Sequence, residues 1–249
     1  MIFDVNVEIG RRSDREIREP WSRDDLLVAI RKFGIDKVLV RHAVSREYDP
    51  LIGNELLCRE IDGCSEFEGI WAIAPHETSS IDEPEVFLQK MKQNNIRSLV
   101  IYPLTHKYLF DVHTWSDIFE IAIEYNIPIF LSLKELNSPW SDIRCVLTAF
   151  PDLRLILNDL GSWPMERYFY PLLKNFKELY LETSTMRLPM GIKNICDTFG
   201  DHRFVFGSGW PVMTPASALT ELRYSAISKE ARNNIFSGNI NRILGEVKL

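Results

Sequence analysis

The sequence predicts an α/β fold, a single (β/α)8 TIM barrel made by one domain of residues 1–249. Short apolar runs alternate with helical patterns along the chain, which is the order of elements in a parallel barrel. The runs are continuously apolar, as in strands that are buried on both faces. In the stretch FPDLRLILNDLG, residues 150–161, such a run ends at Leu157, and Asn158 and Asp159 follow at once. Enzymes of this fold place their chemistry at the C-terminal ends of the strands.

Eight strands are predicted from these apolar runs, and turn-forming or polar residues bound each of them. They cover residues 2–7, 37–40, 67–74, 98–102, 128–131, 153–157, 179–181 and 203–206. Residues 103–110 are predicted to be a loop that carries His106. No strand opens into a glycine-rich phosphate loop, so a doubly wound sheet is the less favoured alternative.

Helices are predicted between the strands from capping residues and from apolar residues at helical spacing. Ser22 can cap the first helix, with Asp24 and Asp25 in its first turn, and Gly34 ends it. Pro84 takes the favoured first-turn position of another helix, which runs to about residue 94. The remaining helices are predicted at residues 54–61, 115–125, 139–150, 163–176, 188–199, 214–228 and 229–236.

The composition is that of a globular protein, with 45% hydrophobic and 26% charged residues among 249. A net charge of −6 argues against a nucleic-acid partner. No apolar run is long enough for a membrane span, and none is expected. The N-terminus lacks the basic and apolar regions of a signal peptide, which predicts a cytoplasmic protein. The four cysteines match no zinc-binding spacing.

Two carboxylates are candidates for catalysis, because Glu8 and Asp159 both follow predicted strands and would face the same mouth of the barrel. Either could act as a general acid or base, since two carboxylates that share a site tend to raise the pKa of one of them. The alternative is structural. In that interpretation the two carboxylates pair with Lys134, Arg41 or Arg187 and hold the top of the barrel together.

Oxygen ligands for a hard cation are a further alternative. Asn6, Glu8 and Asp159 all offer oxygen atoms, which Mg²⁺ or Ca²⁺ would accept. Three ligands without a further carboxylate make a weak site. No cofactor is therefore predicted, and a divalent metal held by these three residues stays an alternative.

The candidates for substrate contacts also follow predicted strands or lie in the loops after them. Arg41 offers a bidentate fork for a carboxylate, and Lys134 and Tyr102 could bind an anion or a carbonyl group. Histidine titrates near neutral pH, which favours its use in binding and proton transfer. The alternatives are ion pairs at the barrel rim and solvated loop histidines. The full set is Asn6, Arg41, His42, His76, Tyr102, His106, Lys134 and Trp210.

Four stretches together resemble the amidohydrolase-related family, the barrel hydrolases and decarboxylases of the amidohydrolase superfamily. In that family the first strand usually carries Asp-x-His-x-His, the fifth ends in His, the sixth in Ala-His-Leu-Gly, and the eighth in Phe-Gly-Ser-Asp-x-Pro. The stretches here are FDVNVE at 3–8, IPIFLS at 127–132, FPDLRLILNDLG at 150–161 and FVFGSGWP at 204–211. The resemblance implies a TIM barrel that binds a small molecule. Relatives are often dimers, so it also implies a homodimer.

The departures from the family pattern fall on its metal ligands. The four histidines and one aspartate of these motifs hold the family's metal. The matching positions here are Asn6, Glu8, Ser132, Asp159 and Gly209. Imidazole suits zinc, and none remains at these positions. The resemblance therefore implies a degenerate metal site without the usual metal-bound hydroxide.

We expect a hydrolase or lyase that acts on a small polar carboxylate, lactone or amide without the usual zinc site. Asp159 or Glu8 would activate water, while Arg41, Lys134 or His106 would hold the substrate and stabilise an oxyanion. One alternative is a catalytically inactive barrel that binds a small molecule or acts as an interaction protein. Another is a hydrolase with an oxygen-ligand or relocated metal site.

Overall fold

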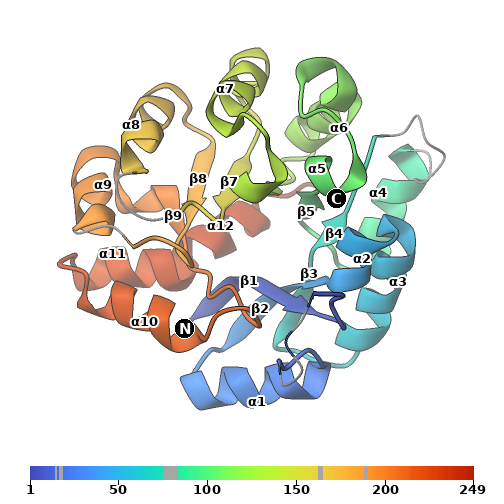
Figure 1. The fold of residues 1–249 in the computed structure, drawn as a ribbon, viewed down its shortest axis with the longest axis horizontal. Coiled ribbons are helices and arrows are strands. Elements are labelled where there is room, and N and C mark those ends of the chain that lie inside the picture. Colours follow the sequence, from blue (N-terminus) through green and yellow to red (C-terminus); the bar gives the residue numbers. More distant parts are fainter. Residues whose placement is uncertain (15, 17–18, 76–83, 162–164, 188–189) are drawn as a thin grey trace.

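A computed structural model gives the structure of residues 1–14, 16, 19–75, 84–161, 165–187 and 190–249. Its centre is a ring of parallel strands, and helices cover the outside of the ring (Figure 1). In these residues the strands are β1 (Phe3–Ile9), β2 (Lys37–His42), β3 (Phe67–Gly69), β4 (Trp71–Ala72), β5 (Leu99–Ile101), β6 (Ile129–Ser132), β7 (Leu155–Asn158), β8 (Leu179–Glu182) and β9 (Phe204–Val205).

The strands pair as one group of three, in the order β1-β2-β3, and one group of six, in the order β4 to β9. β3 and β4 are two halves of one predicted strand, separated by Ile70, whose N–H donates to the Val40 oxygen at 2.8 Å. β1 meets the other end of the second group. The Val5 N–H donates to the Phe206 oxygen at 2.9 Å. The ring is therefore closed, and the predicted TIM barrel is confirmed.

The predicted helices appear in the predicted order, with some differences at their starts and ends, and α2 (Ala43–Glu47) was not predicted. α3 begins at Pro50 rather than at residue 54, because the Asp49 side chain caps it and proline suits its first turn. Residues 103–106 form the short helix α5, so the predicted loop there is wrong; Pro103 again opens it. The described helices are α1 (Arg23–Phe33), α2 (Ala43–Glu47), α3 (Pro50–Ile61), α4 (Pro84–Gln93), α5 (Pro103–His106), α6 (Val112–Glu124), α7 (Pro139–Ala149), α8 (Glu166–Asn175), α9 (Gly191–Phe199), α10 (Pro215–Tyr224), α11 (Lys229–Asn233) and α12 (Asn239–Gly245).

One cluster of buried apolar side chains fills the inside of the ring, and a second lies between strands and helices. α12 contributes Ile240 and Ile243 to the inner cluster. The main-chain oxygens of Ile243 and Leu244 accept hydrogen bonds from Arg154 and Arg97, which precede β7 and β5. α12 therefore covers the N-terminal ends of the strands, and its ribbon is visible through the ring in Figure 1.

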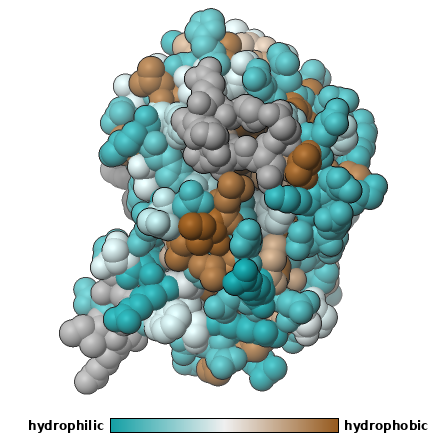
Figure 2. Space-filling model, turned by 90° about the vertical axis from the view of Figure 1, so that its right-hand side faces the viewer, coloured by the Kyte–Doolittle hydropathy of each residue, from teal (hydrophilic) through white to brown (hydrophobic). Residues whose placement is uncertain are grey.

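The outer surface is mainly polar on the face that lies to the right in Figure 1. Figure 2 shows this face, where a hydrophobic area near the centre and smaller ones around it interrupt the hydrophilic surface. Among the described helices, none combines the length and the apolar character needed to cross a membrane.

Candidate active site

A cavity of about 330 Å³ lies where the C-terminal ends of the strands converge. A larger groove of about 640 Å³ lies on the outside, between α9 and α10, and none of the predicted site residues in the described part of the chain lines it. We therefore take the smaller cavity as the candidate site. The predicted residues that line it are Asn6, Glu8, Arg41, Tyr102, Lys134, Asp159 and Trp210.

The two-residue alternation of strands explains why polar side chains gather in this cavity. In β2, Leu39 belongs to the inner apolar cluster, and Arg41, two residues further on, lines the cavity. In β7, Ile156 belongs to the inner cluster, and Asn158, two residues further on, lines the cavity. The inward positions are thus apolar in the middle of the barrel and polar at the C-terminal ends of the strands.

In β1 a shift in register brings polar side chains to the cavity. Phe3 and Val5 belong to the inner cluster, whereas Val7 packs in the outer one. The pairing of β1 with β2 shifts register between Asp4 and Val7, which changes the faces to which later side chains point. Glu8 consequently lines the cavity.

Hydrogen bonds connect Arg41 of β2 to Asn6, and Asn6 to a buried polar network. Its Nη2 donates to Asn6 Oδ1 at 2.5 Å. Asn6 Nδ2 donates to Glu182 Oε2 at 2.8 Å and to Ser184 Oγ at 3.1 Å. The Ser184 hydroxyl also donates to Glu182 Oε2, at 2.7 Å. These contacts fix the amide of Asn6 with its oxygen toward Arg41.

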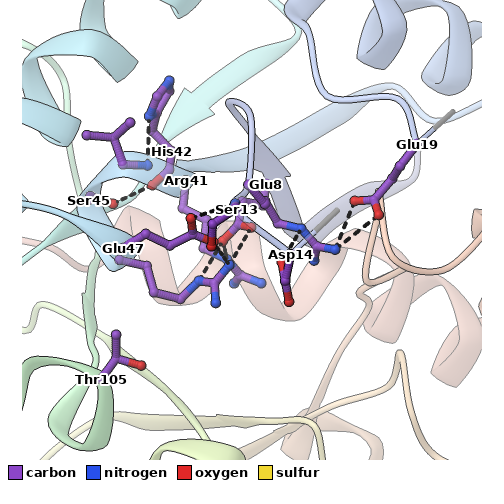
Figure 3. A network of polar contacts seen from close by, with 12 residues as sticks. Glu8, Ser13, Asp14, Glu19, Arg41, His42, Ser45, Glu47 and Thr105 are labelled. Carbon is purple, nitrogen blue, oxygen red and sulfur yellow. Dashed lines mark hydrogen bonds and ion pairs between the residues drawn. The ribbon is translucent and has the colours of Figure 1, made fainter. Parts of the chain in front are cut away.

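The Glu8 carboxylate lies between two guanidinium groups, in the polar cluster that Figure 3 shows. Arg46 Nη2 lies 3.2 Å from Glu8 Oε1, and Arg41 Nε lies 3.6 Å from Glu8 Oε2. Burial opposes the charge of Arg46, but the neighbouring Glu8 outweighs it and raises the pKa of Arg46 above its ordinary value. The pairing of Glu8 with Arg41 was one of the predicted alternatives and is confirmed. Arg46 lies in a helix after β2, and the sequence analysis missed it.

Asp159 follows β7 with a positive φ of 55° and points into the cavity. Its carboxylate accepts hydrogen bonds from Ser132 Oγ at 2.6 Å and from Lys134 Nζ at 3.1 Å. Burial favours the neutral form, but Ser132 and Lys134 outweigh it and lower the pKa of Asp159 below its ordinary value. The predicted ion pair of Asp159 with Lys134 is therefore present in the structure.

Two further carboxyl groups, Asp4 and Glu182, are buried, and both accept hydrogen bonds from Asn6. Burial raises the pKa of Glu182 to about 8, although Ser184 and Asn6 donate to it. Burial also raises the pKa of Asp4 to about 6, although the N–H groups of Asn6 and Ser208 donate to its Oδ1. Neither group was predicted as a site residue. For Glu182, its position at the end of a predicted strand was the available signal.

Two uncharged side chains at the cavity, Tyr102 and Asn158, are buried and carry a polar atom that has no hydrogen-bond partner among the described residues. These atoms are the hydroxyl of Tyr102 and Oδ1 of Asn158. Because an unpaired buried polar atom is costly, a ligand that bonds to either would gain free energy. Asn158 was not predicted as a site residue, although its place after a buried strand could have indicated it.

Of the predicted histidines, His42 and His106 do not line this cavity. His42 Nδ1 accepts a hydrogen bond from the Val44 N–H at 3.2 Å, and Figure 3 shows its ring pointing away from the Glu8 cluster. His106 Nε2 lies 3.0 Å from the Arg46 oxygen. Burial lowers the pKa of both rings below the ordinary value. His76 lies outside the described residues.

The family is identified by its sequence pattern. A sequence model of the family described as amidohydrolase matches residues 73–245. The chain belongs to the amidohydrolase family. No curated protein matches the sequence.

Solved structures share the amidohydrolase fold over almost the whole chain. An uncharacterised TIM-barrel protein of Bordetella bronchiseptica has a TM-score of 0.76 at 15% identity, and the match covers 98% of each chain. A 2,6-dihydroxybenzoate decarboxylase complexed with 2,6-dihydroxybenzoate has a TM-score of 0.75 at 11% identity, with 98% of each chain covered. A probable 2-pyrone-4,6-dicarboxylic acid hydrolase of Acinetobacter baumannii, with citric acid bound, has a TM-score of 0.69 at 14% identity and covers 98% of this chain and 99% of that chain. These likenesses show the fold.

The amidohydrolase pattern implies a metal at the strand ends, but the side chains present do not fit one. Asn6 Oδ1 and the Glu8 carboxylate already face Arg41, and Asp159 already faces Lys134. These side-chain cations would repel a metal ion at the same oxygens. In the part of the chain that the structure describes, no group of three His, Cys, Asp or Glu side chains could hold a metal.

Gly209 lies where the amidohydrolase pattern has aspartate, and it offers no side chain to hold a metal. Its φ of +75° lies in the left-handed region that favours glycine. A Cβ atom at this position would lie 2.7 Å from Met213 Cε. The Met213 side chain would therefore have to move to admit an aspartate at this position.

Proposed function

We propose that the chain is a hydrolase or lyase that acts on a small polar carboxylate, lactone or amide without a metal ion. The observation that carries the proposal is the ionised carboxylate of Asp159 in a cavity that also contains the Arg41 guanidinium. A base and an anion-binding group in one cavity suit the attack of water on a carbonyl group. The relatives named above for 2,6-dihydroxybenzoate and 2-pyrone-4,6-dicarboxylic acid support a small carboxylate as substrate.

In the hydrolytic form of the proposal, Asp159 accepts a proton from water as the water oxygen attacks the carbonyl carbon of the substrate. The bond from that carbon to the leaving oxygen or nitrogen then breaks, and Asp159 returns the proton to the leaving atom. Arg41 and Lys134 hold the substrate carboxylate and stabilise the negative charge on the carbonyl oxygen. The lowered pKa of Asp159 keeps it ionised at neutral pH.

Glu8 and Asn6 have positioning roles in this proposal. Both contact Arg41, and Glu8 is also paired with Arg46, so its carboxylate is committed to the two guanidinium groups. Glu8 therefore fixes the anion-binding group, and Asp159 is the base. Tyr102 and Trp210 form part of the cavity wall that would contact the substrate. Roles for His42, His76 and His106, and a homodimer, stay predictions.

The proposal is tested with protein that has been dialysed against EDTA and mixed with a panel of small lactones, esters and amides. Mass spectrometry of the products measures turnover. Asp159→Asn is expected to lower kcat at least 100-fold on any substrate found, with a smaller change in KM, because the water would lose its base. Asp152→Asn is the matched control, since Asp152 is exposed and lies before β7. Equal rates for Asp159→Asn and the wild type would refute the assigned base.

A binding protein is the second candidate. The observation in its favour is that Glu8 and Asp159 are both paired with cations, as in a structural network. A catalytically inactive barrel would be stabilised by small carboxylates in thermal unfolding and would turn none of them over. Asp159→Asn would then change ligand affinity, and neither the variant nor the wild type would show turnover.

A further inference from the structure

The Arg41 guanidinium at the cavity faces side-chain oxygen atoms of Asn6 and Glu8, which are together called the oxygen nest below. Asn6 Oδ1 accepts from its Nη2 at 2.5 Å, and Glu8 Oε2 lies 3.6 Å from its Nε. The side chain is 16% exposed, so the group lies at the cavity wall rather than in bulk solvent. Its positive charge contributes to the lowered pKa of Asp159, and it opposes the burial that raises the pKa of the Tyr102 hydroxyl.

The surrounding residues hold these oxygens in place. Asn6 Nδ2 donates to Glu182 and Ser184, so the amide cannot turn its nitrogen toward Arg41 without losing both hydrogen bonds. Glu8 is held from its other side by Arg46. The oxygen nest is therefore built by side chains other than Arg41 itself.

We propose that the Arg41 guanidinium is the resident cation of this cavity, filling a site that is preformed for a small planar cation. Asn6 and Glu8 are the groups that recognise it. If Arg41 is shortened, the vacated space joins the cavity and takes up a soluble alkylguanidinium ion. A divalent metal does not replace it, because the Arg46 guanidinium already pairs with the Glu8 carboxylate and would repel a metal ion at the same oxygens. The inference concerns cation binding and needs no turnover. It can therefore fail while the proposed function holds, and the proposed function can fail while the inference holds.

Thermal unfolding of Arg41→Ala with methylguanidinium tests the inference. At 10 mM methylguanidinium, with sodium chloride at equal ionic strength as reference, the melting temperature of Arg41→Ala is expected to rise saturably by about 3 to 5 °C. The wild type and Arg59→Ala are expected to shift by less than about 1 °C. Arg59 is the control, because it is exposed and forms only an i,i+4 pair with Glu55.

Each outcome decides the inference. A rise confined to Arg41→Ala supports it, and an equal shift in all three proteins or in none overturns it. Stabilisation of Arg41→Ala by MnCl2 but not by methylguanidinium would show a metal site and overturn it, as would stoichiometric metal in the dialysed wild type. If Arg41→Ala does not fold, its refolding yield with methylguanidinium replaces the melting temperature, and an unchanged yield overturns the inference.

Discussion

The buried carboxyl group of Glu182 is expected to make the stability of this barrel fall as the pH rises above neutral. Burial raises its pKa from 4.5 to about 8. The folded chain therefore binds one more proton than the unfolded chain between these two pH values. Stability from this proton is complete below about pH 4.5 and is lost as the pH rises through 8.

The magnitude follows from the proton linkage. One proton changes the free energy of unfolding by about 1.4 kcal/mol per pH unit while it is fully bound in the folded state. Between pH 6.5 and pH 8 the expected loss is about 1.5 kcal/mol, because at pH 8 half of the folded molecules have released the proton. Above pH 8 the ionised carboxylate is held by its hydrogen bonds from Asn6 and Ser184.

Urea unfolding at pH 6.5 and pH 8 measures this loss in the wild type and in Glu182→Gln. Glutamine cannot ionise, so the loss attributable to position 182 should disappear in the variant, whatever its starting stability. Asp4→Asn is the control, since Asp4 has a pKa of about 6 and titrates mostly below this interval. Equal pH dependence in the wild type and Glu182→Gln would refute the reasoning.

Three further substitutions test other parts of the structure. Lys134→Met should raise the pKa of Asp159, because it removes a cation that lowers it; a carbon-13 NMR titration of the Asp159 carboxyl measures the shift, and an unchanged value would contradict the pairing. Arg203→Met should lower the free energy of unfolding by about 3 kcal/mol in urea, because the buried guanidinium donates to several main-chain oxygens that would lose their partner; a loss under about 1 kcal/mol would count against this. Gly207→Ala should lower it by about 2 kcal/mol, since the new Cβ would lie 2.1 Å from Glu182 Oε1; an unaffected urea midpoint would mean that this network yields easily.

The barrel could be predicted from the sequence because its strands are continuous apolar runs. The run before Asn158 became β7 and ends at that residue, close to the predicted end at Leu157. Helix starts were less well predicted. Proline and an Asx cap moved the start of α3 to Pro50, and α5 is a single turn too short to show a helical period.

The site was predictable only in part. Asp159 and Arg41 follow apolar runs, so the barrel fold alone brings them to the same end. Arg46 comes from a helix after β2, and no strand pattern places it beside Glu8. The buried pair of Asn6 with Glu182 joins residues that are 176 positions apart in the sequence, which become neighbours only when β1 closes the ring.

The sequence by itself determined the fold and the departure from the family's metal ligands. Both can be read from short stretches of sequence. The apolar runs indicate the fold, and the residue types at the motif positions show the departure. The tertiary structure decided which side chains each carboxylate pairs with. Glu8 and Asp159 look alike in sequence, but the register shift in β1 turns Glu8 toward Arg41 and Arg46, while Asp159 meets Ser132 and Lys134. Charge pairing depends on distances across the barrel, and those exist only after the strands have closed.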